Sequence, residues 1–192
     1  ANRDSEALRL HTFELDATAR GTRWQASLRP QGASAMASGT MRVETRDAPM
    51  LLRQLGVEVL PVPLNGGGKL QASLRAGQAS GFDLSASGTI GGVDLSFDGQ
   101  VSTRRAQGAV TLNTRDAAPL LRSVGYGLPD VTTSLPVEGN AQLDWQEAQL
   151  QLTKVSGNLA GQALGGALTA DWSEPSAKLT GELQAQRVSL PQ

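Results

Sequence analysis

The chain has 192 residues and a formal net charge of −1, a length that allows one domain, or two small ones, with a sizeable core. A charge near zero argues against nucleic acid as the main partner, because binding phosphates requires a basic face. The absence of cysteine excludes disulfides and thiolate zinc sites. The 22 glycines favour many tight turns, and aromatic residues make up only 4% of the chain, so the core must be mostly aliphatic.

A repeat of 69 residues organises the sequence. The letters TRDA occur at residues 45–48 and again at 114–117, and the same offset relates Gly39 to Gly108 and Gly88 to Gly157. We therefore predict one continuous sheet made of a partial repeat (1–38), two repeat units (39–107 and 108–177) and the start of a further repeat (178–192). Because the sequence opens and closes within a repeat, we interpret it as a segment of a longer protein.

Most of each repeat alternates apolar and polar residues with a period of two. Leu84, Ala86 and Ile90 fall on one side of such a segment, whereas Ser85 and Ser87 fall on the other. This alternation is typical of strands with one apolar and one solvated face, and glycine pairs between the segments suit hairpin turns. The sequence predicts an all-β fold: a curled antiparallel repeat sheet of about eleven strands, forming an open groove, with short connecting helices.

One element of each repeat has a helical pattern instead. Leucines at 51, 52 and 55 form a stripe at helical spacing. An aspartate before each such segment suits the helix N-cap, and a glycine after it suits the left-handed position at the helix end. We predict short helices near 48–55 and 117–124, with matched caps that contribute alike to stability: Asp47, Gly56, Asp116 and Gly125.

A wide sheet with one apolar face cannot leave that face bare in water. It must curl on itself, stack on a second sheet or hold lipid, and the alternation alone does not decide among these. Small residues on the apolar side, such as Ala72 and Ala86, favour an open groove because they leave room inside a curled sheet. The residues predicted to line this groove are Leu84, Ile90, Val93, Leu95, Phe97, Leu112, Leu143, Trp145, Leu152 and Trp172.

The sequence offers no set of residues suited to catalysis. His11 is the single histidine and lies near the start of the chain, where we expect it to be exposed and inert. Glycines at 66–68 before Lys69 lack the spacing of a phosphate-binding loop, and Leu70 stands where Ser or Thr is required. Acidic residues are scattered along the strands, as expected of a solvated face. We predict no enzyme activity, no cofactor and no metal site.

The order of elements in each repeat resembles that of the AsmA family. The resemblance rests on a strand, a helix with the pattern T-R-D-A-x-x-L-L-R-x-x-G, the letters L-P-V, the spacing G-x-x-Q and a meander of strands, and it covers most of the chain from about Gly39 onward. Residues 175–183 are similar to the segment with which that family begins a new unit. The anchor helix of the family is not present in this sequence.

This resemblance implies a bacterial envelope protein of the periplasm, attached to the inner membrane through a segment outside this chain. Family members of the TamB-like type are similar to bridge-type lipid carriers. The implied function is a hydrophobic groove for phospholipid transport between the inner and outer membranes, in outer-membrane biogenesis. The implied partners are phospholipid acyl chains and the remaining repeats and membrane anchor of a longer parent chain. The alternative is a structural or interaction spacer with a dry packed core and no cargo. The arginines at 46 and 115 are expected to be structural, with headgroup binding as their alternative role.

Overall fold

The computed structural model describes residues 12–31, 36–54, 66–76, 81–123, 134–173 and 178–185. Four residues singled out in the sequence lie outside these ranges: His11, Leu55, Gly56 and Gly125.

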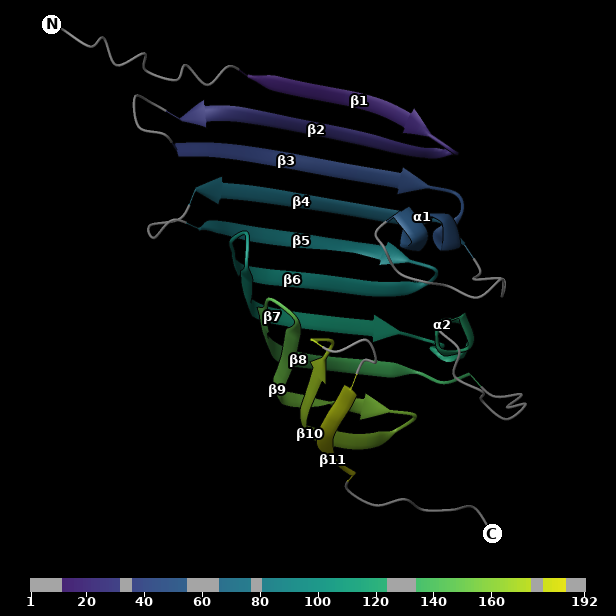
Figure 1. Ribbon diagram of the computed structural model, residues 1–192. Coiled ribbons are helices and arrows are strands. Elements are labelled where there is room, and N and C mark those ends of the chain that lie inside the picture. Colours follow the sequence, from purple (N-terminus) through teal and green to yellow (C-terminus); the bar gives the residue numbers. More distant parts are fainter. Residues whose placement is uncertain are drawn as a thin grey trace, which may run out of the picture.

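The described residues form one antiparallel sheet of eleven strands, in which each strand pairs with its neighbours in the chain (Figure 1). This confirms the predicted all-β class and the open, curled sheet. The strands are β1 Phe13–Ala19, β2 Thr22–Gln31, β3 Met36–Thr45, β4 Gly68–Ala76, β5 Phe82–Ile90, β6 Val93–Val101, β7 Arg105–Thr114, β8 Val137–Gln146, β9 Gln149–Leu159, β10 Gln162–Asp171 and β11 Lys178–Ala185. The helices are α1 Ala48–Gln54 and α2 Ala118–Ser123, close to the predicted ranges.

The two repeats contribute equivalent elements to this sheet. Strand β3, helix α1 and strands β4 to β6 correspond to β7, α2 and β8 to β10. Strands β4 and β8 begin at Gly68 and Val137, and β6 and β10 begin at Val93 and Gln162, so both pairs start 69 positions apart. The repeat boundaries predicted at 39 and 108 fall inside β3 and β7. In the structure, each repeat of elements begins where these strands begin, at Met36 and Arg105.

The register of the strands sorts side chains onto two different faces. Leu95 pairs with Leu112, and Phe97 pairs with Val110, whereas the intervening Ser96 pairs with a threonine. Residues paired across antiparallel strands share a face, so this pattern builds an apolar face and a polar face. The pattern holds from β1 to β11, because the pairing links every strand to the next.

The sheet curls toward its apolar face. In Figure 1 the first strands lie side by side, and the last strands turn forward, toward the side on which the helices lie. Helix α1 packs on the apolar face, where Ala48 and Leu51 join Val43 and Ile90 in a small buried core. Strands β1 and β11 are the two edges of the sheet, which therefore stays open.

Glycines on the apolar face let neighbouring strands approach closely. Gly99 and Gly108 pair with each other, and a Cβ atom on either would collide with the backbone of the other strand. A side chain at such a position would push the strands apart. The same holds for Gly157 in β9, whereas Gly139, its partner in β8, has room: a Cβ there would lie 3.7 Å from the nearest atom, the Ser156 carbonyl oxygen.

Each helix is preceded by a threonine and an aspartate whose side chains accept hydrogen bonds from backbone amides. The Asp47 amide donates to the Thr45 hydroxyl at 3.1 Å, and the Met50 amide donates to the Asp47 carboxylate at 3.0 Å. The latter bond is that of an N-cap, as predicted. The Asp116 amide likewise donates to Thr114, at 3.2 Å, so this threonine–aspartate arrangement explains why the TRDA letters repeat.

The second aspartate has an additional role, which corrects the prediction of matched caps. The Asp116 carboxylate accepts from the Ala118 amide at 3.1 Å and also from the Leu135 amide at 3.1 Å. The Ala117 amide donates to the Leu135 carbonyl at 2.8 Å. Asp116 therefore fixes both the start of α2 and the segment that leads into β8, and it is half-buried, whereas Asp47 is exposed.

The two aspartates should differ in their contribution to stability. Asp47→Ala removes one N-cap bond, so we expect it to lower the free energy of unfolding by about 1 kcal/mol. Asp116→Ala leaves two backbone amides without their acceptor, so we expect a larger loss, of about 2–3 kcal/mol. Urea unfolding of both variants measures this difference. Equal losses would show that the Leu135 contact contributes nothing.

The paired glycines provide a second test of the fold. Gly157→Ala should lower the free energy of unfolding by about 1–3 kcal/mol, because the new methyl group meets the backbone of β8. Gly139→Ala is the matched control, since its methyl group has space and alanine restricts the unfolded chain, so we expect a change between zero and a gain of about 1 kcal/mol. The urea unfolding midpoints of the two variants give the comparison. A similar loss of stability in both variants would contradict the close approach of β8 and β9 at Gly157.

Candidate functional site

All ten residues predicted to line a groove belong to the apolar face. Nine lie in β5 to β9 at positions that the register places on this face. The tenth, Trp172, follows β10 directly, and its amide continues the ladder by donating to the Ala148 carbonyl at 2.9 Å. The structure therefore brings the ten residues onto one surface, and lipid contact by them stays a prediction.

Two of the ten residues are not available at the surface. Ile90 and Val93 pair with each other and are only 5% and 1% exposed. Ile90 belongs to the core beside α1, and Val93 pairs with the buried Thr114, which precedes α2. The other eight are half-buried or exposed, with Leu95 at 36% and Trp172 at 42%.

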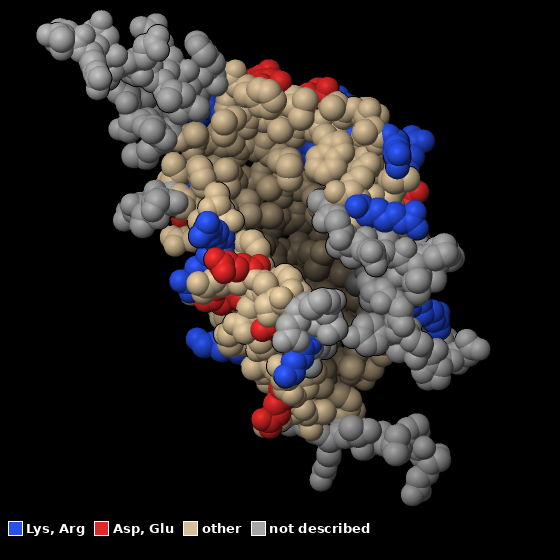
Figure 2. Space-filling model, viewed as in Figure 1, with Lys and Arg blue, Asp and Glu red and all other residues tan. Residues whose placement is uncertain are grey.

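The apolar face carries no charge among its paired positions. None of the residues that the register places on this face, from Phe13 in β1 to Ala185 in β11, is Asp, Glu, Lys or Arg. Figure 2 looks onto this concave side: the floor of the hollow is uncharged, and charged side chains gather around its margins. The polar side chains at its paired strand positions are Thr22, Thr45, Thr114 and Gln162.

These polar residues follow one another across one end of the strands. Thr22 pairs with Thr45, and the Thr22 hydroxyl donates to the Thr45 hydroxyl at 3.3 Å. The Thr114 hydroxyl lies within hydrogen-bond distance of the Gly92 and Asp116 carbonyl oxygens, at 3.0 and 3.1 Å. This end of the sheet, called the helix end below, is the one at which both helices lie (Figure 1). Its hydroxyls are therefore occupied within the fold.

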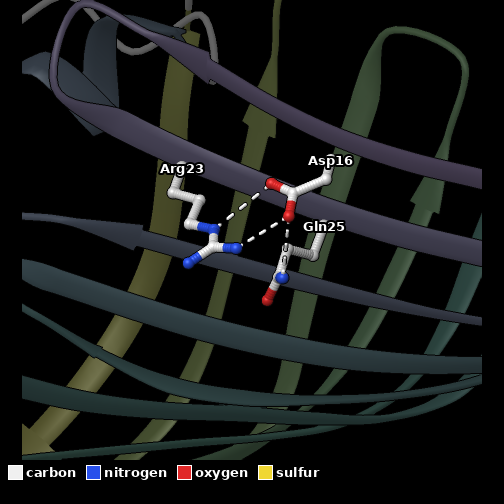
Figure 3. Close-up of polar contacts among 3 residues, drawn as sticks. All are labelled: Asp16, Arg23 and Gln25. Carbon is white, nitrogen blue, oxygen red and sulfur yellow. Dashed lines mark hydrogen bonds and ion pairs between the residues drawn. The ribbon is translucent and has the colours of Figure 1, made fainter.

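The polar face binds its charged groups to one another. Arg23 donates from Nη2 to the Asp16 carboxylate at 2.7 Å and from Nε at 3.2 Å, and Gln25 donates to the same carboxylate at 3.3 Å (Figure 3). The hydrogen bond from Arg23, followed by that from Gln25, lowers the pKa of Asp16, and the Asp16 carboxylate raises the pKa of Arg23. Asp16 and Arg23 are exposed and Gln25 is half-buried, as expected of a solvated face.

Two shallow depressions open on the polar face. One of about 900 Å³ lies over β1 to β5, and one of about 500 Å³ lies over β2 to β4. Their walls carry hydroxyl, amide and charged side chains, among them Glu14, Gln71 and Arg75, together with apolar residues of β1 to β4 whose side chains belong to the other face. An acyl chain placed there would desolvate polar groups without replacing their hydrogen bonds, so the apolar face is the better candidate site.

The acidic and basic residues that the structure describes are dispersed. They contain no cluster of three or more His, Asp or Glu residues that could hold a metal ion, and the acidic residues in the strands lie on the polar face. Arg46 and Arg115 are exposed, and neither forms an ion pair with another residue that the structure describes. Neither described helix is long and apolar enough to cross a membrane.

Comparison of the chain with protein-family models, with curated proteins and with solved structures finds no match. The functional argument therefore depends on the apolar face itself.

Sequence reasoning missed the threonines at the helix end. Thr45 and Thr114 each lie two residues before a predicted capping aspartate, and the alternation of their strands places them on the apolar face. This position could have indicated their role, because a hydroxyl on an apolar face must find a hydrogen-bond partner within the fold.

Proposed function

We propose that this chain is a segment of a periplasmic AsmA-like protein, whose apolar face forms a hydrophobic groove for phospholipid transport between the inner and outer membranes. The observation that carries the proposal is an uncharged, concave sheet face that the other described residues leave largely uncovered. Phe82, Leu95 and Trp172 on this face are each more than a third exposed. Contiguous apolar surface of this kind marks a binding site rather than a stable surface in water.

Acyl chains suit this face because they require no hydrogen bonds. Covering apolar surface is favourable by about 25 cal/mol per Å² and depends little on direction. A face without charges, with its hydroxyls already occupied, offers no polar group that would hold an acyl chain at one place along the groove. Phospholipids could therefore move along the groove past a series of similar contacts, which is the requirement for transport rather than storage.

The dimensions of the sheet fit such a cargo. Strands of nine or ten residues, such as β6 and β8, are about 30 Å long at ~3.3 Å per residue, comparable to an extended acyl chain. Eleven strands at a spacing of ~4.8 Å give a groove about 50 Å long across the strands. Repeats that continue the same sheet in a parent chain would lengthen the groove without changing its cross-section.

The alternative is a spacer module whose apolar face is packed dry. The buried core by α1 favours it locally, since Val43 and Leu51 are fully buried there. At the opposite end of the strands, exposed residues such as Phe82 argue against a dry core. The two functions differ in whether lipid contacts the middle of the apolar face.

Photo-crosslinking tests this difference. A photoreactive amino acid at position 95 or 143, both on the apolar face, should capture phospholipid from membranes in a folded protein. The matched control is position 85, because Ser85 lies on the polar face of the same sheet and should capture none. Thermal unfolding of each variant establishes that it is folded. Folded variants in which positions 95 and 143 capture no more lipid than position 85 would contradict lipid carriage and favour the spacer.

A further inference from the structure

The two ends of the apolar face differ in how they are covered. At the helix end, Thr22, Ile90, Val93 and Thr114 are all buried. At the opposite end, called the open rim below, β5 starts and β4, β6 and β8 finish. One register row crosses the sheet there and is wholly apolar: Ala76, Phe82, Val101, Ala106, Trp145, Leu150, Ala170 and Leu179.

Aromatic side chains concentrate at the open rim. Phe82 is 39% exposed and Trp172 is 42% exposed, and Trp145 is half-buried. The two tryptophans stand on either side of β9: Trp145 pairs with Leu150, and the Trp172 amide binds the Ala148 carbonyl. The third tryptophan, Trp24, packs against the core beside α1, near the helix end. At the open rim, the exposed ring of Phe82 therefore stands in a row with Trp145 and half-buried aliphatic residues.

Tryptophan favours the boundary between hydrocarbon and polar headgroups, because its ring is apolar and its N–H donates a hydrogen bond. A tryptophan pair at one margin of an apolar groove thus resembles the aromatic belt at a membrane surface. The row from Phe82 to Trp145 marks where hydrocarbon would end and headgroups begin.

Two cationic side chains lie near this row, on different sides of the sheet. Arg75 pairs with Asp83 and therefore belongs to the polar face. Arg104 lies in the turn before β7, two residues before Ala106, and its carbonyl oxygen accepts from the Glu147 amide at 3.1 Å. Arg104 is exposed and has no ion-pair partner among the residues that the structure describes. A guanidinium group at this margin suits a phosphodiester.

We propose that phospholipids in the groove point their acyl chains toward the helix end and hold their phosphate headgroups at the open rim, beside Trp145, Trp172 and Arg104. This inference rests on the proposed function and assigns an orientation to its cargo. The helix end, with Arg46 and Arg115, is the opposite choice. It is disfavoured because Ile90 and Val93, in the centre of that end, are already buried by the protein.

Single-tryptophan variants test this orientation. Trp24 and Trp145 differ by about six residues along the strand direction, or ~20 Å, so they report on different depths. Three proteins keep one tryptophan each, at 24, 145 or 172, with phenylalanine at the other two positions. Each is incubated with phosphatidylcholine vesicles containing lipid brominated in its acyl chains, or lipid with a nitroxide on the choline headgroup. It is then separated from the vesicles by flotation.

The expected result is that acyl-chain bromine reduces emission from the tryptophans of the groove, whereas the headgroup nitroxide reduces emission from Trp145 and Trp172 and leaves Trp24 bright. If the headgroup nitroxide reduced the emission of Trp24 as much as that of Trp145 and Trp172, or more, the proposed orientation would be wrong. The proposed function would not be affected by that result. No loss of emission from any tryptophan with brominated chains would overturn the proposed function, and the orientation with it.

A variant that fails to fold does not end the test. The natural chain can be loaded with phosphatidylcholine that carries a photoreactive group on its headgroup, and the crosslinked peptides can be located by mass spectrometry. Crosslinks at Phe82, at residues 104–106 and at Trp145 are expected, and Arg104→Gln should reduce their yield. Crosslinks confined to residues 45–54 and 114–123 would place the headgroups at the helix end and overturn the proposal.

Discussion

Successive side chains of a strand point to opposite faces, and the whole molecule depends on keeping that alternation in register through eleven strands. A shift of one residue in any pairing would turn every later apolar side chain to the wrong face. Tight turns prevent this, such as the one at Gly91 and Gly92, both with positive φ. Where the register does shift, beside Lys154 in β9, the adjacent residues resume the same faces: Leu152 still pairs with Leu143 and Leu168.

This constraint separates stability from function. The polar face holds itself together with short-range bonds, such as Arg105 to Asp144 at 2.7 Å and Ser96 to Thr111 at 2.7 Å, each of modest value because the groups are exposed. The buried core is small and lies at the helix end. Most of the apolar face thus lies outside this buried core, and we propose that a cargo covers it. We propose that the headgroup side of that cargo is set by the one end the helices leave uncovered.

Much of the fold could be predicted from the sequence, because the alternation and the helix pattern are local. The strands near Leu84 and Leu95, helix α1 and its cap Asp47 follow from a few neighbouring residues. The double role of Asp116 could not be predicted, since its second donor, Leu135, is distant in the sequence. The burial of Ile90 and Val93 depends on where the helices lie on the sheet. Period-two spacing places a residue on a face but does not say what covers it.

The central claim is that the apolar face holds phospholipid, and quantitative lipid analysis tests it most directly. The folded chain is produced in the bacterial periplasm and purified without detergent, and phospholipid in an organic extract is measured per mole of protein by mass spectrometry. Leu95→Asp places a charge on the apolar face, and Ser96→Asp places it on the polar face of the same strand. The proposal predicts bound phospholipid in the natural chain and in Ser96→Asp, and much less in a folded Leu95→Asp protein. A natural chain without phospholipid, or equal amounts in both variants, would contradict it.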